Sequence, residues 1–352
     1  MPNYELELSP TNTPTEGGEG SLDTSLLNGN SIQRTGYITT VDEDGNTKTL
    51  NIKDGTAFNS TIQGLGDVLG IILVSDDVAF AATVEIPEDN FTLTMPYWSE
   101  GTYSGTINWG DESTSANAIG ADHTYATAGT YSITIDGEIT GWFTYDNDEV
   151  VDDVNGNIHE VLISIDAFGS NFDFGTYATQ TNGSLFDGCL LLESIATDIP
   201  TENVTTMSGM FYECSVFNQP LSFDTSNVTD MSYMFYVALN FNQPLSFDTS
   251  NVTDMSSMFG ISSFNQDLSA FDTSSVTDMS SMFAACSSFN QDLSSFDTSN
   301  VTDMGYMFYN CSAFNQDLSG WCVNLIPSEP DVFSVLATAW VLPKPNWGAA
   351  CA

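Results

Sequence analysis

Apolar residues recur at a fixed period in the C-terminal half of the chain. A Met-Phe pair returns every 24 or 25 residues, each time at the end of the pattern M-x-x-M-F. In one copy, Leu221 and Phe223 stand two residues apart, as side chains on one face of a strand do. The apolar positions of residues 228–235 follow the spacing i, i+3, i+6 and i+7, which predicts a short helix or helical turn. The pairs are Met210-Phe211, Met234-Phe235, Met258-Phe259, Met282-Phe283 and Met307-Phe308.

No single copy of this pattern can bury both of its faces, so successive copies are expected to stack and to share one core. A period of 24 or 25 residues lies within the range of leucine-rich repeats. We therefore predict an α/β solenoid of short strands and short helices, similar to leucine-rich repeats, over residues 185–320. Residues 321–352 are predicted to be its C-terminal cap. The recurring Met and Phe side chains are assigned to the core, in preference to a thioether metal site or a cofactor site.

The N-terminal half shows the period-two alternation of β-strands. Residues 89–165 contain several short alternating stretches separated by Gly and Asp turns, which predicts an all-β sandwich. Residues 31–88 contain two strand-like stretches around D-E-D-G-N, which predicts a hairpin in a small β-rich anchor or interaction region. Residues 1–30, rich in Thr, Gly, Asn and Ser, are assigned to a flexible arm, and residues 166–184 to a linker. The apolar stretch at residues 64–74 is predicted to be a buried strand or helix, because it is too short to span a bilayer.

A stretch inside the predicted sandwich carries a recognisable motif. Residues 109–111 read W-G-D, and residues 123–131 contain H-T-Y followed by A-G-T-Y. With these motifs, residues 107–137 resemble the PKD-type immunoglobulin-like β-sandwich, whose members are usually extracellular spacers or contact modules. Glu112 stands where that family usually has Gly, so the conformation of the turn could differ. His123 is expected to pack beside this turn and to bond backbone or Asp111, and His159 has no assigned role.

The repeats also resemble a known family. The pattern F-N-Q-x-L-S…F-D-T-S-x-V-T-D-M-x-x-M-F is similar to the leucine-rich repeats of BspA-type surface proteins, first grouped as a mycoplasma lipoprotein-associated repeat. The tail at residues 318–352 is similar to the segment that often closes such arrays. Together with the PKD-like stretch, the resemblance covers residues 89–352. It implies a surface adhesin or interaction module.

The charge of the chain is extremely acidic and excludes several classes of partner. Four Lys and Arg residues face 47 Asp and Glu residues, giving a formal net charge of -43. Such a surface repels nucleic acid and anionic membranes, which are bound through basic side chains. High salt would screen the self-repulsion, because the Debye length falls to about 3 Å at 1 M, and a marine setting is therefore favoured. The N-terminal residues show neither the basic nor the apolar region of a secretory leader, so Sec export is not expected.

Aspartates recur in two columns of the array, and two interpretations are open. Stacked carboxylates could be bridged by Ca²⁺, which prefers hard oxygen ligands. Alternatively, each Asp could cap its own turn by accepting backbone N–H groups, and this interpretation is favoured. The Asn-Val-Thr triplets match glycosylation sequons but are predicted to form turns. The first column is Asp224, Asp248, Asp272 and Asp297, and the second is Asp230, Asp254, Asp278 and Asp303.

The six cysteines fall into two groups. Cys322 and Cys351 flank the tail, and we predict a disulfide between them that clips the cap onto the last repeat. Each of the other four lies three residues after the Phe that ends a repeat's apolar pattern (the repeat Phe). Two other copies of the repeat have Ala238 and Ser262 at this position, which we call a slot of the repeat. These are predicted to be buried thiols, although pairs from neighbouring repeats would be close enough to bond. The four are Cys189, Cys214, Cys286 and Cys311.

No catalytic motif is present, and the chain is therefore predicted not to be an enzyme. The predicted function is non-catalytic surface binding or structure, in a virion appendage (a fibre or decoration protein) of a marine tailed phage. The N-terminal region would dock on other virion proteins, and the solenoid would contact a host surface glycan or protein. The alternative is a BspA-type adhesin at the bacterial cell surface, and the weakest alternative is a carbohydrate-active enzyme. Calcium is the one cofactor considered. Membrane insertion is not expected. Self-association is compatible with a surface-binding or structural function.

Tyrosines are the side chains most expected to contact a ligand. Tyr233, Tyr236, Tyr306 and Tyr309 occupy slots that vary between copies of the repeat, whereas the core positions stay constant. Amphipathic aromatic side chains contribute much of the energy of protein interfaces. These four tyrosines are therefore the predicted binding residues.

Overall fold

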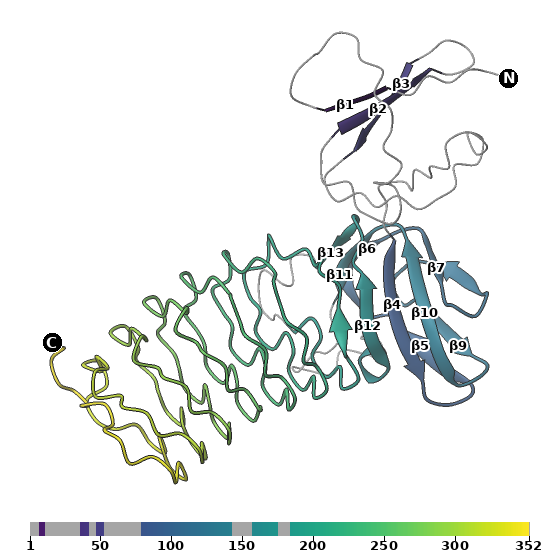
Figure 1. Cartoon of the computed structure of the whole chain (residues 1–352). Coiled ribbons are helices and arrows are strands. Elements are labelled where there is room, and N and C mark those ends of the chain that lie inside the picture. Colours follow the sequence, from purple (N-terminus) through teal and green to yellow (C-terminus); the bar gives the residue numbers. More distant parts are fainter. Residues whose placement is uncertain are drawn as a thin grey trace. The chain divides into compact units, whose positions relative to one another are not determined.

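The computed structural model describes residues 7–10, 36–41, 47–52, 79–142, 157–174 and 184–351 (Figure 1). The chain forms two compact units, residues 1–78 and residues 79–352. In the first unit, β1 (Glu7–Pro10), β2 (Gly36–Val41) and β3 (Thr47–Ile52) form an antiparallel sheet in the order β1-β2-β3. The predicted hairpin is confirmed, because β2 pairs with β3 from Val41↔Thr47 to Gly36↔Ile52. β1 shows that part of the predicted flexible arm is a strand, whereas the D-E-D-G-N turn and residues 64–74 lie outside the described residues.

The second unit begins with β-sheets that enclose one core. A six-stranded sheet has the order β14-β12-β4-β10-β7-β8, a three-stranded sheet the order β13-β11-β6, and β5 pairs with β9. The strands are β4 (Phe80–Ile86), β5 (Phe91–Thr94), β6 (Tyr97–Tyr103), β7 (Thr106–Asn108), β8 (Thr114–Ala116), β9 (Asp122–Tyr125), β10 (Gly129–Asp136), β11 (Ile139–Trp142), β12 (Leu162–Ala167), β13 (Phe172–Asp173) and β14 (Ser194–Ile195). A 3₁₀ turn, η2 (Ile158–Glu160), precedes β12. The all-β character predicted for this region is therefore present.

Alternation along β4 places one face of this strand in the core. In β4, Phe80, Ala82, Val84 and Ile86 are buried, and the residues between them are half-buried. β4 lies in the middle of the six-stranded sheet, between β12 and β10, although it precedes residue 89, where the sequence places the start of the sandwich. The reason is that F-A-A-T-V-E-I alternates as a strand does, so it supplies a central strand.

The W-G-D turn is held by a charged hydrogen-bond network. His123 Nε2 lies 2.8 Å from Asp111 Oδ2, and Ser113 donates its backbone N–H to Asp111 at 3.1 Å. Partial burial would raise the pKa of Asp111, but the hydrogen bonds from Ser113 and His123 outweigh it and hold the pKa below its ordinary value. Glu112 adopts a left-handed φ of 73°, a conformation that explains why Gly is usual at this place. Asp111 is thus the partner of His123 that the sequence predicts.

The six-stranded sheet continues directly into the first repeat. β14 pairs in parallel with β12, and Glu193 donates its N–H to the carbonyl of Ile163 at 2.7 Å. Asp198 accepts the N–H groups of Phe168 and Gly169 at 3.2–3.3 Å. The predicted linker therefore contains the end of β12 and all of β13, and the sheets cover the N-terminal end of the repeats.

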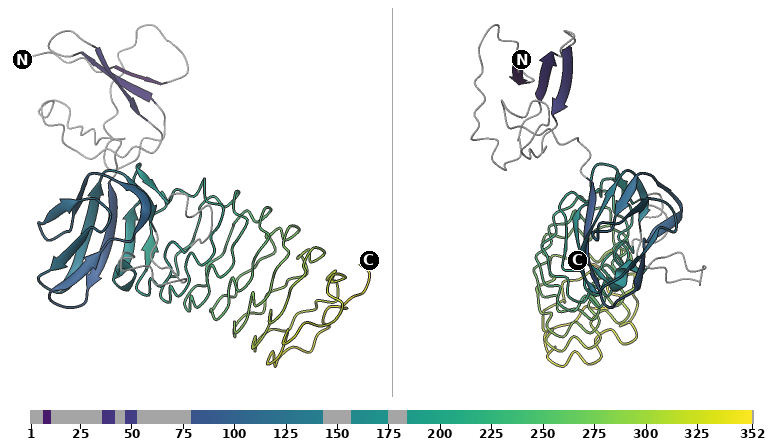
Figure 2. Two further views of the ribbon diagram at one scale, coloured as in Figure 1. Left: turned by 180° about the vertical axis from the view of Figure 1, so that it is seen from behind. Right: turned by 90° about the vertical axis from the view of Figure 1, so that its right-hand side faces the viewer.

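The repeats, residues 184–351, form a stack of coils joined by backbone hydrogen bonds, which we call the repeat stack. Figure 2 shows its coils side by side, from teal to yellow. Thr229 donates to the carbonyl of Thr205 in the preceding coil, and Asp230 forms parallel bridges with Thr206 and Asp254. Each coil therefore repeats the same contacts with its neighbours.

The helical turn predicted for residues 228–235 is not formed, and the described residues of the repeat stack contain no helix. Alternate N–H groups, those of Met231, Tyr233 and Phe235, instead donate to carbonyls of the next coil at 2.9–3.0 Å. Tyr233 and Val237 have left-handed φ values of 57° and 58°, which interrupt a right-handed helix. The segment is a pair of consecutive tight turns, which also bring residues three apart to the same side.

The recurring Phe and Met side chains form the core, as predicted. Successive repeat Phe rings stack at 5.5–5.8 Å from Phe186 to Phe308. A second column, from Phe217 to Phe314, stacks beside it at 5.9–6.4 Å. All the Met residues of M-x-x-M-F are fully buried. The repeated spacing therefore builds one continuous core from coil to coil.

An amide ladder lies beside the Phe columns and was not predicted. In the F-N-Q pattern, Asn218 Oδ1 accepts the N–H of Asn242 at 2.9 Å, and Asn242 Oδ1 accepts that of Asn265 at 2.8 Å. The ladder continues through Asn290 and Asn315 to Val341 and Leu342 in the last coil. Each Asn thus satisfies a backbone donor that the irregular coil would otherwise leave unpaired.

The last coil is closed by a disulfide and by aromatic residues. Cys322 and Cys351, the pair named from the sequence, are joined with their Cα atoms 5.1 Å apart. Trp340 meets Phe308 and Phe314 edge-to-face at 5.3 and 4.8 Å, and Trp347 meets Phe333 at 4.9 Å. These rings cover the apolar end of the stack, which a repeat array must shield from water.

Candidate functional site

The predicted binding residues lie in two separate places on the repeat stack. Tyr233 and Tyr236 are 5.5 Å apart between ring centroids, and Tyr306 and Tyr309 are 6.0 Å apart. Tyr233 and Tyr306 are 43% and 48% exposed, which makes them the accessible member of each pair. The two coils between the pairs have Ser257 and Ser281 in the slot of Tyr233, and Gly260 and Ala284 in that of Tyr236. The structure therefore does not bring all four tyrosines into one site.

A fifth tyrosine completes the first group. The ring of Tyr212 stacks on that of Tyr236 at 5.3 Å and lies 6.4 Å from that of Tyr233. Sequence reasoning missed Tyr212, although it follows its repeat Phe directly, as Tyr236 does. We call Tyr212, Tyr233 and Tyr236 the first tyrosine cluster, and Tyr306 and Tyr309 the second.

The first tyrosine cluster packs against the backbone of the next coil. A Cβ atom on Gly260 would lie 2.6 Å from the ring of Tyr236, so only Gly leaves room for the ring there. Tyr233 adopts a left-handed φ of 57° and is held by its N–H donating to Ser256 at 2.9 Å. The rings are therefore held by the turns and not by long flexible loops.

Carboxylates lie beside the first tyrosine cluster. Burial, followed by the charge of Glu213, raises the pKa of Tyr212. Burial, Tyr233 and Glu213 raise the pKa of Tyr236 in the same way. The backbone N–H of Glu213 donates to the carbonyl of Tyr236 at 2.8 Å, which holds this residue against the next coil. One acidic side chain therefore acts on two of the three phenols.

Asp187 is a buried carboxyl near Glu213, and we expect it to lower stability as the pH rises. Burial, followed by the charge of Glu213, raises its pKa to about 7. The stability that its neutral form provides is complete below the unfolded pKa and is lost as the pH rises through about 7. Asp187→Asn should therefore raise the free energy of unfolding by about 1–3 kcal/mol at pH 8, with little gain at pH 4. Denaturant unfolding at both pH values measures this, and an equal effect at both would contradict it.

Both aspartate columns are bonded to the backbone of their own turns. In the first column, Asp224 and Asp248 accept the N–H groups of Ser226 and Ser250 at 2.9 and 3.1 Å. Hydrogen bonds from the following Ser residues hold the pKa of each Asp in this column below its ordinary value. In the second column, the residues two positions on donate to Asp230, Asp254, Asp278 and Asp303 at 2.8 Å. A third column, Asp267, Asp292 and Asp317, does the same and was missed.

We propose that the repeat stack is stable without calcium, because the aspartates of both columns already cap their own turns. Within residues 79–142, 157–174 and 184–351, no three His, Cys, Asp or Glu side chains are grouped so as to hold a metal ion. The turn-capping bonds stabilise the aspartates without a cation. We expect the melting temperature to be unchanged, within about 1 °C, when EDTA replaces millimolar CaCl₂ at constant ionic strength. A fall of several degrees in EDTA would instead support bridged columns.

In three of the Asn-Val-Thr triplets, the Asn side chain bonds to the preceding coil. Asn227 Nδ2 donates to the carbonyl of Glu202 at 2.9 Å, and Asn251 Nδ2 to that of Ser226 at 2.8 Å. Asn300 makes the same bond to Ser274 at 2.7 Å. The amide nitrogens that a glycan would occupy are thus engaged in holding the coils together.

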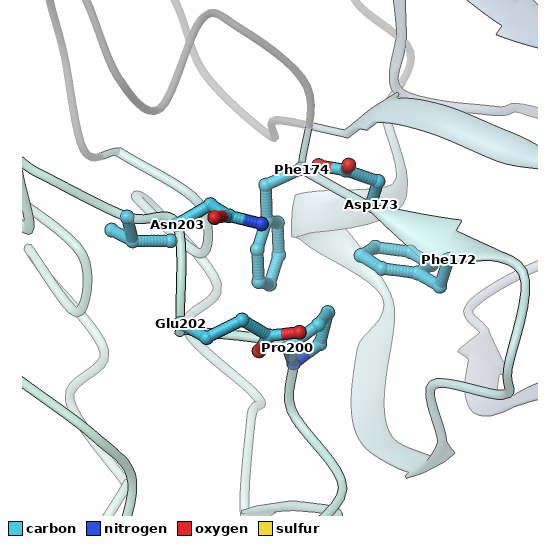
Figure 3. Close-up of a pocket in the computed structure, with 7 residues that line it drawn as sticks. Phe172, Asp173, Phe174, Pro200, Glu202 and Asn203 are labelled. Atoms are coloured by element: carbon cyan, nitrogen blue, oxygen red, sulfur yellow. The ribbon is translucent and has the colours of Figure 1, made fainter.

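The remaining candidate groups are four thiols and a small pocket. Cys189, Cys214, Cys286 and Cys311 are buried, and burial raises the pKa of Cys286 to about 11. A pocket beside β13 is lined by Phe172, Asp173, Phe174, Pro200, Glu202, Asn203 and Val204 (Figure 3). Figure 3 shows the ring of Phe174 pointing toward Pro200 and Glu202, with Asp173 turned the other way. Its polar side chains are the carboxyls of Asp173 and Glu202 and the amide of Asn203.

A family model described as "Mycoplasma protein of unknown function, DUF285" matches residues 180–260 and 245–339. The two matches overlap and lie over the repeat stack. BspA-like repeat proteins contain this family's repeat, so the match is compatible with a surface repeat protein. No curated protein and no solved structure matches the chain. Among the described residues, no helix has the length and apolar composition needed to cross a membrane.

Proposed function

We propose that this chain is a non-catalytic adhesin of the BspA type, which contacts a ligand on another surface through the tyrosine clusters of its repeat stack. The observation that carries the proposal is the placement of Tyr233 and Tyr306. Both side chains are exposed in slots where the intervening coils have Ser257 and Ser281. Because the core does not require tyrosine at these positions, we attribute the two side chains to recognition of a ligand.

The regular backbone supports this assignment. We read the repeat stack as a solenoid of leucine-rich-repeat type in which tight turns replace the short helices. Such arrays present long surfaces on which single residues vary without a change in the scaffold. The family match over residues 180–339 supports this reading, because BspA-like repeat proteins contain this family's repeat.

Two further features favour a location outside the reducing cytoplasm. The Cys322–Cys351 disulfide is a type of bond that persists in oxidising compartments. The net charge of -43 keeps a surface protein soluble and separate from its copies. We propose the cell surface as the location and a surface protein or glycan as the partner.

The sandwich is proposed to be a PKD-like spacer that also covers the first coil. The match of W-G-D and H-T-Y…A-G-T-Y, together with the Asp111–His123 pair, supports this reading. We propose that the first unit, residues 1–78, carries the anchor or contact region.

The virion appendage has no support from the comparisons, and we therefore retain the adhesin as the proposed function.

The adhesin predicts that the tyrosines are needed for attachment. We expect the full chain, immobilised on beads, to retain intact cells or a defined array of surface glycans and envelope proteins. Tyr233→Ser/Tyr236→Ala and Tyr306→Ser/Tyr309→Ala should together lower retention at least tenfold, because each substitution removes an interface aromatic. Ser and Ala occupy the same slots in other coils, so these variants should fold.

The control for this experiment is Phe223→Leu, a conservative change at a half-buried repeat position. It should leave retention unchanged. Equal retention by the parent and the four-tyrosine variant would overturn the adhesive role of these residues. Turnover of any glycan on the array would contradict the assignment as a non-enzyme.

A further inference from the structure

The two tyrosine clusters differ in chemistry, and this difference points to a ligand class. The first has three tyrosines with Glu213 beside them, whereas the second has two tyrosines with Asn310 in the slot of Glu213. The aromatic groups are therefore similar, but only the first combines them with a carboxylate in that slot.

The first tyrosine cluster presents aromatic surface in a fixed arrangement. Tyr212 and Tyr236 stack with an interplanar angle of 21°, and Tyr233 meets Tyr236 edge-on at 64°. Tyr233 is 43% exposed and the other two are half-buried. Faces of aromatic rings attract cations through their quadrupole, and Arg and Lys are the side chains that use this attraction.

Glu213 adds the charge that such a cation needs. Glu213 directly follows Tyr212, and its backbone N–H donates to the carbonyl of Tyr236 at 2.8 Å, so its side chain leaves the backbone where these two tyrosines meet. The side chain is half-buried, so its charge is screened less than that of a free surface carboxylate. A guanidinium or ammonium group over the rings could therefore also bond to a carboxylate.

The cation has to come from outside residues 54–343. This stretch contains no lysine or arginine, and Lys344 is paired with Glu329 at 2.9 Å. The net charge of -43 also attracts basic partners over long range and repels acidic ones.

From these observations we propose that the first tyrosine cluster and Glu213 bind an arginine or lysine side chain presented by a basic segment of a partner protein. This inference rests on the proposed function, because it names the partner class for part of the same surface. The partner's cation lies over the rings of Tyr233 and Tyr236 and pairs with Glu213. The second tyrosine cluster, without a carboxylate in the equivalent slot, does not bind it.

The test uses the full chain and a fluorescein-labelled peptide, GRSGRSGRSG, in fluorescence anisotropy at 150 mM NaCl. The same peptide with citrulline in place of arginine keeps the shape and removes the charge. We expect Tyr212→Ala/Tyr233→Ser/Tyr236→Ala to weaken binding of the arginine peptide at least tenfold with no change in net charge. Tyr306→Ser/Tyr309→Ala is the matched control and should stay within twofold of the parent. Glu213→Gln, which keeps the side-chain shape, should weaken binding about tenfold.

Several outcomes would overturn this inference. Equal binding by all variants would show attraction by overall charge alone. Equal binding of the citrulline peptide, or displacement of the arginine peptide by a neutral glycan, would show a ligand that is not recognised as a cation. If the peptide fails but attachment to surfaces still depends on the tyrosines, only this inference fails. If attachment is also independent of them, the proposed function fails with it.

Discussion

Replacing Phe259 with alanine is expected to lower the free energy of unfolding by about 3–5 kcal/mol. Phe259 is fully buried, and its ring lies 4.0 Å from that of Phe264 and 5.8 Å from those of Phe235 and Phe283. The neighbouring coils are held in register by backbone bonds, so they cannot collapse into the space that the ring leaves. Urea unfolding followed by near-ultraviolet circular dichroism measures the effect.

The control for Phe259→Ala is Tyr233→Ser in the preceding coil. Tyr233 is exposed, and Ser stands in its slot in two other coils, so its replacement should change the free energy of unfolding by less than about 1 kcal/mol. A loss below about 1 kcal/mol for Phe259→Ala would show that the Phe column does not carry the core.

Removing the Cys322–Cys351 disulfide is expected to lower the free energy of unfolding by about 3–4 kcal/mol. The bond links residues 29 apart, and reopening this loop increases the entropy of the unfolded chain. Cys322→Ser/Cys351→Ser should melt earlier than the parent in thermal scans, and dithiothreitol should lower the parent to the same temperature.

Cys214→Ala is the matched control for the disulfide, because Ala238 occupies the same buried slot in the next coil. This variant should keep the full response to dithiothreitol. A parent whose melting temperature does not respond to dithiothreitol would show that the bond adds nothing to stability.

Much of the stack could be predicted from its period. The Met and Phe positions are buried as expected, because side chains that recur at one phase of a repeat can share a core only by stacking. The short helix was predicted incorrectly for a physical reason. Two consecutive turns also place residues three apart on the same side, so the apolar spacing cannot separate them from a helix. The left-handed φ at Val237 carries no sequence signal, because Val rarely adopts it.

The candidate site was predictable in part. Comparison of equivalent positions in the repeats identified Tyr233 and Tyr306, and both of these tyrosines are exposed. This comparison works because the position of a residue within its repeat determines its exposure. It missed Tyr212 and Glu213, whose importance depends on contacts between coils and not on their own copy of the pattern. The amide ladder of Asn218, Asn242 and Asn265 was missed for the same reason, since the bonds join residues 23 or 24 apart.

The pairing of β12 with β14 has a consequence for how the stack opens. In a one-dimensional array, a terminal coil contacts one neighbour and therefore frays more easily than a central coil. Here the first coil is hydrogen-bonded to the six-stranded sheet, and the last is closed by the disulfide. Neither end is a free boundary from which unfolding can proceed one coil at a time. Opening must begin inside the array, where two interfaces break at once, so residues 184–351 should behave as a single cooperative block.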